Sequence, residues 1–291
     1  MMTVVVPTYN RREYLQLALK SALDQTVSDY EVLVVDDGST DDSAALVERM
    51  QKTDSRLRLV VHGKNEGVSS ALNTGIENCR SEYVTFLGSD DLFARERIEH
   101  LSARLDDAEG DAVVYSDTKY IDAGQAVVGS EPSKASERPQ GMIFPDLLTG
   151  SFRFSGGILA LPKRCFDEVG LYDERLSWAE DFDMALRLAE RFPFVFDPLS
   201  TYGYRIYGGN KIRTLDKKDR WSQQGRILES HLIQDYGRLD EETRRTSFRY
   251  LFSCFVASGQ WGEILRYGFT KEAGFCAMVG LPLRLSKKAP R

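Results

Sequence analysis

Short apolar runs alternate with helical patterns in the N-terminal half of the chain, and this alternation limits the possible folds more than any other feature. Each run is nearly continuous, as expected for a strand covered on both faces of a parallel sheet. The expected strands are Thr3–Pro7, Glu31–Val35, Leu57–Val61, Tyr83–Leu87 and Ala112–Tyr115. Between them, at 14–23 and 68–76, apolar residues recur at helical spacing. This order predicts an α/β open, mostly parallel sheet flanked by helices, with right-handed crossovers.

Composition excludes several classes of protein. The 291 residues are 42% hydrophobic, enough for one large domain and a smaller appendage. The net charge of −6 argues against a general nucleic-acid binder, which needs a basic surface. The N-terminus lacks the pattern of a secretory signal, and no apolar run approaches the roughly 20 residues that span a bilayer. We therefore expect a cytoplasmic, non-integral protein.

The cysteines and histidines give no metal or disulfide pattern. Cys79, Cys165, Cys254 and Cys276 are widely spaced within apolar segments, as is typical of reduced core residues. The three histidines, at 62, 100 and 231, lack ligand spacing and are expected at the surface or at its boundary.

Polar segments follow three of the expected strands. They read "PTYNRREYL", "DDGSTDDS" and "GSDD". Open α/β sheets bind ligands at the carboxyl ends of their strands, so these segments should meet at one edge. Turn formation and helix capping would explain "DDGST" equally well. The spacing does not fit an EF-hand, and no glycine-rich phosphate loop follows any strand.

A second acidic group lies farther along, in "WAEDFDMALRLAERF". The residues at 178, 182, 185, 188, 189 and 192 trace one apolar helix face, which places Glu180 and Asp181 in the first turn. The helix dipole favours acids there, so their role can be purely structural. The same field keeps a carboxylate ionised and aimed out of the helix end, as a general base requires.

Four segments together carry a family resemblance. "VVVPTYNRREYL", "YEVLVVDDGSTDDS", "NEGVSSALNTGIENCRSEYVTFLGSDD" and "WAEDFDMALRL" stand in the order and approximate spacing of the family 2 inverting glycosyltransferases. That family has the nucleotide-sugar-binding GT-A fold. The resemblance covers about Thr3 to Arg213 and is carried by several motifs in register.

The resemblance implies a donor site. By similarity, Pro7, Thr8 and Tyr9 would line the nucleoside pocket, and Asp37 would hydrogen-bond the base while Asp36 supports the turn. Ser89 would contribute to the same donor site. Asp90 resembles the metal-coordinating member of a DxD-type motif, with Asp91 nearby, and the implied cation is Mn²⁺ or Mg²⁺. The adjacent carboxylates would then tolerate one another because a hard cation and a diphosphate lie between them.

The resemblance also implies the chemistry. Asp181 looks like the general base that deprotonates the acceptor hydroxyl, with Glu180 preceding it. A single displacement would invert the anomeric carbon, so that an α-linked donor, which we expect to be UDP-linked, gives a β-linked product. The acceptor would be a hydroxyl of a glycan or of a lipid-linked saccharide, as in cell-surface polysaccharide biosynthesis.

The chain departs from the family pattern at two positions. Gly88 stands where the family often has an aspartate, which removes one possible metal ligand. Tyr207 stands where a histidine often follows Tyr-Arg, which makes Arg205 a candidate partner for the diphosphate. These departures keep two alternatives open, a non-catalytic nucleotide-sugar-binding relative and a nucleotidyltransferase.

We expect a catalytic domain at 1–213 and a helical subdomain at 214–291. The subdomain begins with two amphipathic helical patterns, from Asp216 and from Asp240, and ends in the apolar run Phe275–Leu285 with basic residues at 287, 288 and 291. That end is expected either to pack on the protein or to hold it peripherally on an anionic membrane. Acceptor binding is expected at 141–157 and 203–213.

Overall fold

The computed structural model describes residues 1–108, 111–130, 138–152, 158–209, 216–260 and 262–263. The chain forms two compact units, Met1–Ile143 with Phe154–Gly208, and Phe144–Arg153 with Gly209–Arg291. The predicted boundary after residue 213 lies outside the described residues. The second unit also takes in Phe144–Arg153, a segment that we assigned to the first domain.

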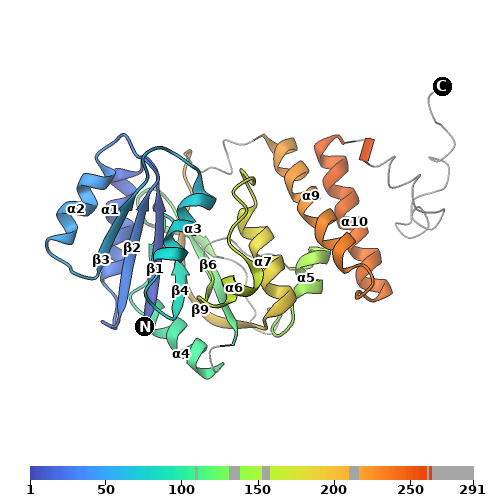
Figure 1. The fold of residues 1–291 in the computed structure, drawn as a ribbon, viewed down its shortest axis with the longest axis horizontal. Coiled ribbons are helices and arrows are strands. Elements are labelled where there is room, and N and C mark those ends of the chain that lie inside the picture. The colour runs from blue at the N-terminus through green and yellow to red at the C-terminus, as the bar shows by residue number, and fades with distance from the viewer. Residues whose placement is uncertain (109–110, 131–137, 153–157, 210–215, 261, 264–291) are drawn as a thin grey trace. The chain divides into compact units, whose positions relative to one another are not determined.

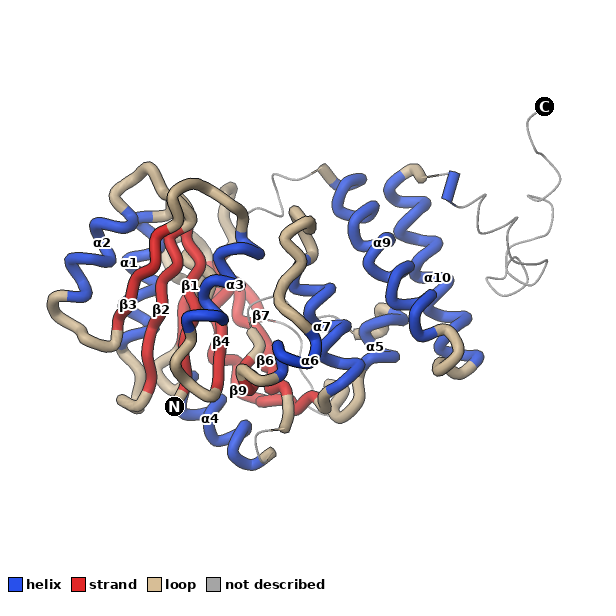
Figure 2. The backbone as a smooth tube through the Cα atoms, viewed as in Figure 1, coloured by secondary structure: helices blue, strands red, loops and turns tan. Residues whose placement is uncertain are grey.

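The first unit is built on one mixed β-sheet. Its described strands are β1 (Met2–Thr8), β2 (Tyr30–Asp36), β3 (Leu57–Val61), β4 (Tyr83–Phe86), β5 (Leu92–Phe93), β6 (Val113–Ile121), β7 (Val127–Ser130), β8 (Ala160–Pro162) and β9 (Phe194–Arg205). They follow the order β3-β2-β1-β4-β8-β6-β9-β5, and β7 pairs with β6. Figure 2 shows the parallel neighbours β3, β2, β1 and β4 side by side, as predicted. Because β8 is antiparallel to both β4 and β6, the predicted parallel arrangement describes the N-terminal half of the sheet.

Helices occur in both units (Figure 1). The first unit contains α1 (Arg12–Leu23), α2 (Ser43–Gln51), α3 (Val68–Asn78), α4 (Arg97–Asp107), α6 (Cys165–Val169) and α7 (Glu180–Arg191). The second contains α5 (Phe144–Thr149), α9 (Lys217–Asp235) and α10 (Glu241–Ser258). The predicted helices at 14–23, at 68–76 and in the C-terminal region are therefore present.

The core lies where the apolar strands meet their helices. Every residue of β2 is buried, which explains its unbroken apolar run. Leu33 and Val35 pack against Ala71 of α3. Helix α3 also approaches β1 so closely that a Cβ on Gly75 would lie 2.3 Å from Val5 Cγ1. Glycine inside a helix costs about 1 kcal/mol relative to alanine, and here it permits this close packing.

Strands β5, β7, β8 and β9, and most of β6, lie outside the predicted strands. Strand β6 continues beyond Tyr115 to Ile121, and its buried Ser116 accepts a hydrogen bond from Arg97 at 3.2 Å. Strand β9 pairs with β6 in parallel and with β5 antiparallel. This strand was not predicted, and it brings Tyr202 and Arg205 to the site described below.

The second unit is a small helical bundle. Helices α9 and α10 are capped by Asp216 and Asp240, whose side chains accept hydrogen bonds from the backbone N–H groups of Lys218 and Thr243 at 2.6 and 2.8 Å. They pack closely at Gly225, where a Cβ would lie 3.0 Å from the Phe255 ring. The apolar run Phe275–Leu285 and the basic end lie outside the described residues.

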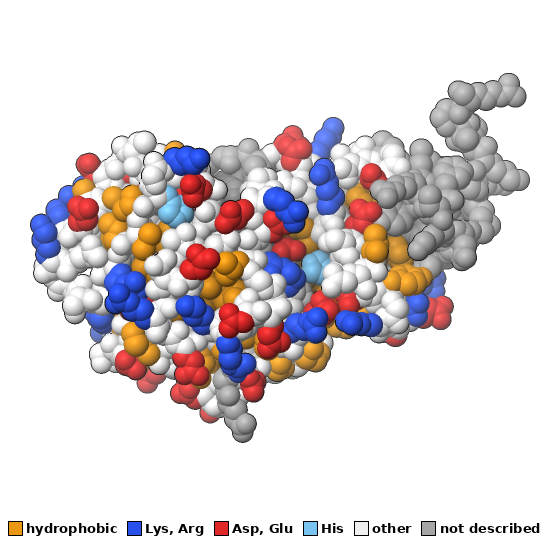
Figure 3. Space-filling model, in the orientation of Figure 1, with side chains coloured by type: hydrophobic (Ala, Val, Ile, Leu, Met, Phe, Trp, Pro, Cys, Tyr) orange, Lys and Arg blue, Asp and Glu red, His pale blue; other side chains and the backbone are white. Residues whose placement is uncertain are grey.

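The described part of the chain bears on three further expectations. Cys79, Cys165 and Cys254 are reduced and buried, as predicted, while Cys276 lies beyond the described residues. None of the helices described is both long enough and apolar enough to span a bilayer. Figure 3 shows acidic and basic side chains interspersed over the face in view.

Candidate active site

The carboxyl ends of β1, β2 and β4 lie next to one another because these strands are parallel neighbours. The loops that follow β1 and β2 are joined by Asn10, which has a left-handed backbone with φ 49°. Its Oδ1 accepts the Thr40 N–H at 2.7 Å, and its own N–H donates to Ser39 Oγ at 2.9 Å. An open cavity of about 610 Å³ lies here, lined by residues 10–14 and 40–42. The predicted gathering of the first two motifs at one edge is therefore present.

Thr8 and Asp36 end β1 and β2 at the same register, so their side chains lie on the same face of the sheet. Asp36 is fully buried, and its Oδ1 accepts the Ser39 N–H at 2.6 Å. The other oxygen of Asp36 and the hydroxyl of Thr8 are buried without a hydrogen-bond partner among the described residues. Buried polar atoms are nearly always paired, so these two atoms are candidates for a partner that the described residues do not supply.

Asp37 faces a different set of groups. Its Oδ1 lies 2.8 Å from His62 Nδ1 and accepts the Glu66 N–H at 2.9 Å, while its Oδ2 accepts the Gly67 N–H at 2.8 Å. His62 also contacts Thr74 Oγ1 through Nε2 at 2.9 Å. Asp37 thereby holds the start of α3, and its two oxygens already have protein partners. The sequence did not indicate this role for His62, which is half-buried.

The glycine after these acids is required by its surroundings. Gly38 has φ +73°, and a Cβ on it would lie 2.4 Å from the backbone carbonyl carbon of Lys64. Only glycine combines that backbone with so close an approach. The β2–α2 loop therefore packs directly on the segment that leads into α3.

Asp91 is buried beneath the turn after β4. Its Oδ2 accepts the Tyr202 hydroxyl at 2.6 Å, and its Oδ1 accepts the Arg205 N–H at 2.8 Å. Burial, with the neighbouring charge of Asp90 as the second cause, raises the pKa of Asp91 to about 7. The space that it fills exists because residue 88 is glycine, since a Cβ there would lie 2.6 Å from Asp91 Oδ2. The structure thus gives the Gly88 departure a packing role.

Asp90 is the accessible member of the pair. Its Oδ2 accepts the Tyr207 hydroxyl at 2.8 Å, while Oδ1 accepts no hydrogen bond from the described residues. Burial and the charge of Asp90 raise the pKa of Tyr207, so this phenol remains a donor. The Tyr207 ring packs on Tyr14 at 4.8 Å between centroids. One open carboxylate oxygen suits Mg²⁺ or Mn²⁺, which are commonly bound through one or two carboxylates together with substrate phosphates.

Arg205 lies within the fold rather than at its surface. Its Nε donates to the Asp90 carbonyl at 2.6 Å, and its Nη1 donates to the carbonyls of Asp122 and Ala123 at 2.9 and 3.1 Å. The guanidinium stacks over the Tyr14 ring at 4.9 Å. These contacts make Arg205 a brace of the Asp90 turn, and its predicted contact with a diphosphate stays a prediction.

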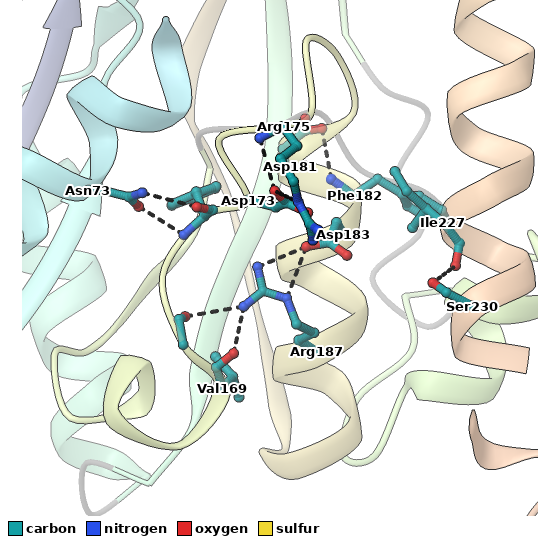
Figure 4. Close-up of polar contacts among 12 residues, drawn as sticks. Asn73, Val169, Asp173, Arg175, Asp181, Phe182, Asp183, Arg187, Ile227 and Ser230 are labelled. Carbon is teal, nitrogen blue, oxygen red and sulfur yellow. Dashed lines mark hydrogen bonds and ion pairs between the residues drawn. The ribbon is translucent and has the colours of Figure 1, made fainter. Parts of the chain in front are cut away.

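Glu180 and Asp181 occupy the first turn of α7, as predicted, and both are half-buried. The helix begins after Ala179, which has a left-handed backbone with φ 62° although it is not glycine. Such a conformation costs roughly 1–2 kcal/mol and is common near functional sites. Asp181 Oδ1 accepts the N–H of Phe182 at 2.8 Å (Figure 4).

The charges of both acidic groups act on Tyr204. Burial is the main reason that the pKa of this phenol rises to about 12, and the charges of Asp91, Asp90 and Asp181 add to the rise. Of the remaining predicted residues, Ser89 is buried, Pro7 is half-buried, and Tyr9 is 43% exposed beside them.

Comparison with known proteins agrees with this fold. Residues 3–167 match the family model described as glycosyl transferase family 2. An uncharacterised glycosyltransferase of Rickettsia prowazekii is 28% identical over 231 residues, which make up 76% of this chain and 70% of that relative. The chondroitin synthase of Escherichia coli is 30% identical over 223 residues, 74% of this chain but 30% of the synthase. The chain therefore spans most of one relative and about a third of the other.

Among solved structures, S. aureus TarS 1–349 matches with a TM-score of 0.65 at 20% identity, covering 87% of this chain and 72% of the TarS chain. Its complex with UDP-GlcNAc matches with a TM-score of 0.66 at 20% identity, covering 98% and 82%. At this level of identity the likeness concerns the fold alone. It confirms the predicted GT-A architecture.

Proposed function

The chain belongs to glycosyl transferase family 2, and on this premise we propose that it transfers a sugar from a UDP-linked donor to a hydroxyl group with inversion at the anomeric carbon. The observation that carries the proposal is the pair of acidic groups that the fold presents: Asp90 after β4, whose Oδ1 accepts no hydrogen bond from the described residues, and Asp181 in the first turn of α7. This arrangement joins a carboxylate suited to a donor-bound cation with a carboxylate suited to a general base. TarS, which shares the fold, has been solved with UDP and with UDP-GlcNAc, and this supports uridine as the nucleoside.

Thr8 and Asp36 are the groups that we assign to the base. The Asp36 oxygen without a partner would accept the N–H of the uracil ring, and the Thr8 hydroxyl would donate to the adjacent ring carbonyl. This assignment differs from the one made by resemblance, because both Asp37 oxygens are used by His62 and the start of α3. Pro7 and Tyr9 would line the pocket beside them.

Asp90 would hold Mg²⁺ or Mn²⁺ through Oδ1, with Ser89 in the same turn. When bound, such a cation neutralises the charge that develops on the leaving diphosphate. The protein prepares for this by fixing the other Asp90 oxygen on Tyr207 and the Asp90 carbonyl on Arg205. Asp91, buried behind the turn, would support it from the interior.

Asp181 would act as the general base, with Glu180 beside it. Its carboxylate takes the proton of the acceptor hydroxyl while the hydroxyl oxygen bonds to the anomeric carbon and the bond from that carbon to the diphosphate oxygen breaks. The products are the glycoside and UDP. The acceptor that we propose is a hydroxyl of a glycan or a lipid-linked saccharide, and the similarity to a chondroitin synthase supports a carbohydrate acceptor.

Calorimetric titration with UDP, in Mn²⁺ and in EDTA, tests the donor site, with GDP as the nucleotide control. We expect UDP to bind more tightly than GDP, and Mn²⁺ to strengthen UDP binding. Asp90→Asn should remove the metal enhancement, whereas Asp107→Asn, an exposed carboxylate on α4, should leave it unchanged. Equal enhancement in the Asp90 variant would refute the metal assignment.

A second measurement separates the alternatives by their products. A transferase slowly hydrolyses its donor and releases UDP, and a nucleotidyltransferase releases pyrophosphate from UTP. A non-catalytic relative binds UDP and does neither. UDP release from a UDP-sugar, dependent on Mn²⁺, is the result that we expect.

A further inference from the structure

Asn73 makes a long-range contact that has no role in the reaction proposed above. It lies on α3 and is 7% exposed. Its Oδ1 accepts the backbone N–H of Tyr172 at 2.8 Å, and its Nδ2 donates to the Tyr172 carbonyl at 3.0 Å. The same Nδ2 lies 3.1 Å from Glu174 Oε1. One amide therefore pairs with both backbone groups of a residue 99 positions away, as Figure 4 shows.

The clamped residue, Tyr172, is itself wedged into the core. Its ring meets Phe86 edge-on, with 6.0 Å between centroids, and Phe166 at 6.5 Å. Phe86 is the last residue of β4, the strand that leads into the Asp90 turn. Tyr172 also begins the loop that runs into α7, where Asp181 lies in the first turn. Tyr172 thus contacts β4, which leads into the Asp90 turn, and precedes α7, which carries Asp181.

The charges of the acids of α7 act on the Tyr172 side chain. Burial is the main cause that raises the pKa of the Tyr172 phenol, and the charges of Asp181 and then Glu180 are the next causes. The acids at the start of α7 therefore act on the residue whose backbone Asn73 binds.

Helix α3 provides a fixed frame for this contact. Its start is bound by the Asp37 carboxylate, and its middle packs on β1 at Gly75. Arg187 of α7 holds the same end of the loop: its Nη1 donates to the Val169 carbonyl at 2.6 Å, and its Nε donates to Asp183 within α7 at 2.9 Å (Figure 4). The start of the loop into α7 is thus bound both by α3 and by α7 itself.

We propose that Asn73 is a positioning residue for Asp181: its amide holds the Tyr172 backbone, and Tyr172 sets the start of α7 against the end of β4. This inference rests on the proposed function, since it takes Asp181 as the base. Asn73 touches neither substrate nor cation in this account. It acts through the distance between Asp181 and the Asp90 turn.

The test is a double-mutant cycle on the rate of UDP release from UDP-GlcNAc, UDP-glucose and UDP-galactose in Mn²⁺. Asn73→Ala should lower kcat by about 10²-fold, the cost of misplacing a catalytic group by about 1 Å, and leave the KM for the donor and the affinity for UDP unchanged. In the Asp181→Asn background the same change should have no further effect, because the group that it positions is gone. Asn78→Ala, on the same helix, removes only a local bond to the Thr74 carbonyl and should match the wild type.

The clamp itself can be measured without turnover. Hydrogen exchange of the Tyr172 amide should be faster in Asn73→Ala than in the wild type or in Asn78→Ala, since this N–H donates to Asn73 Oδ1. Asn73→Ser keeps a short hydroxyl here without adding a charge beside Glu174, so it provides a milder variant should the alanine variant fail to fold. We expect its kcat to fall between those of the wild type and Asn73→Ala.

The outcomes separate this inference from the proposed function. Equal losses of kcat from Asn73→Ala in both backgrounds would show that Asn73 does not act through Asp181, and would overturn the inference while leaving the base in place. Unchanged exchange at Tyr172 would overturn it as well. No UDP release by the wild type, or full activity in Asp181→Asn, would instead remove the proposed function, and the positioning role with it.

Discussion

Gly88→Ala should destabilise the protein through one contact. The new Cβ would lie 2.6 Å from Asp91 Oδ2 and 3.2 Å from its Cγ, too close for either atom to stay in place. The Asp91 carboxylate cannot move without disturbing its hydrogen bonds with Tyr202 at 2.6 Å and with the Arg205 N–H at 2.8 Å. The glycine has no left-handed φ, so the cost arises from packing and from these bonds.

The magnitude follows from three effects. Weakening a hydrogen bond to a charged group costs about 1.5–3 kcal/mol, and overpacking costs about 1–3 kcal/mol. Replacing glycine by alanine returns about 0.4–1 kcal/mol by restricting the unfolded chain. We therefore expect the free energy of unfolding to fall by about 2–5 kcal/mol.

Urea denaturation of the wild type and the variant measures this difference. Gly63→Ala is the matched control, because a Cβ at Gly63 meets no atom within 4 Å, and it should change stability by less than about 1 kcal/mol. In an Asp91→Ala background, which removes the clashing oxygen, Gly88→Ala should become nearly neutral. A Gly88→Ala variant as stable as the Gly63 control would refute the packing role of Gly88.

Three further predictions concern the site and its support. Tyr207→Phe should weaken Mn²⁺ binding about tenfold, as is typical when a partner of a metal ligand is lost, measured by electron paramagnetic resonance; unchanged affinity would mean that the phenol does not orient Asp90. Asp181→Asn should cut UDP release by about 10²–10⁴-fold with UDP affinity intact, whereas Asp167→Asn, an exposed acid on α6, should have no effect. Burial alone would raise the pKa of Glu31, but hydrogen bonds from Thr3, the Arg80 N–H and Arg58 lower this pKa overall. The stability that the Glu31 carboxylate contributes is therefore present above the pKa of Glu31 in the unfolded chain, and it is lost as the pH falls through the pKa in the folded protein. Glu31→Gln should therefore cost about 1–3 kcal/mol in urea denaturation at pH 7 and much less near pH 3, and a loss independent of pH, or one equalled by exposed Glu48→Gln, would contradict this.

The sequence predicted β1 to β4 because their apolar runs are nearly unbroken, a pattern that few other structures produce. It did not predict β9, whose segment contains Pro198 and Gly203, residues that are depleted in strands. Pairing with β6 and β5 overrides that local preference. Tyr202 was therefore missed as the partner of Asp91.

The candidate site, like the sheet, could be predicted from the sequence only in part. Asp90 and Asp181 could be found because each stands in a motif with fixed neighbours. The different environments of Asp36 and Asp37 could not be predicted, since adjacent residues at a strand end point to opposite faces and the sheet decides what each one meets. His62 was missed because its partner, Asp37, is close only in the folded chain.

Strand β9 links the segment 202–207 to the turn 88–91. Tyr202 donates to Asp91, the backbone of Arg205 bonds the same carboxylate while its side chain bonds the Asp90 carbonyl, and Tyr207 donates to Asp90. A substitution in either segment changes the partners of the other, although more than a hundred positions separate them. Libraries of variants that aim to alter donor choice should therefore vary the two segments jointly, because changing either segment alone would mostly remove the hydrogen bonds between them.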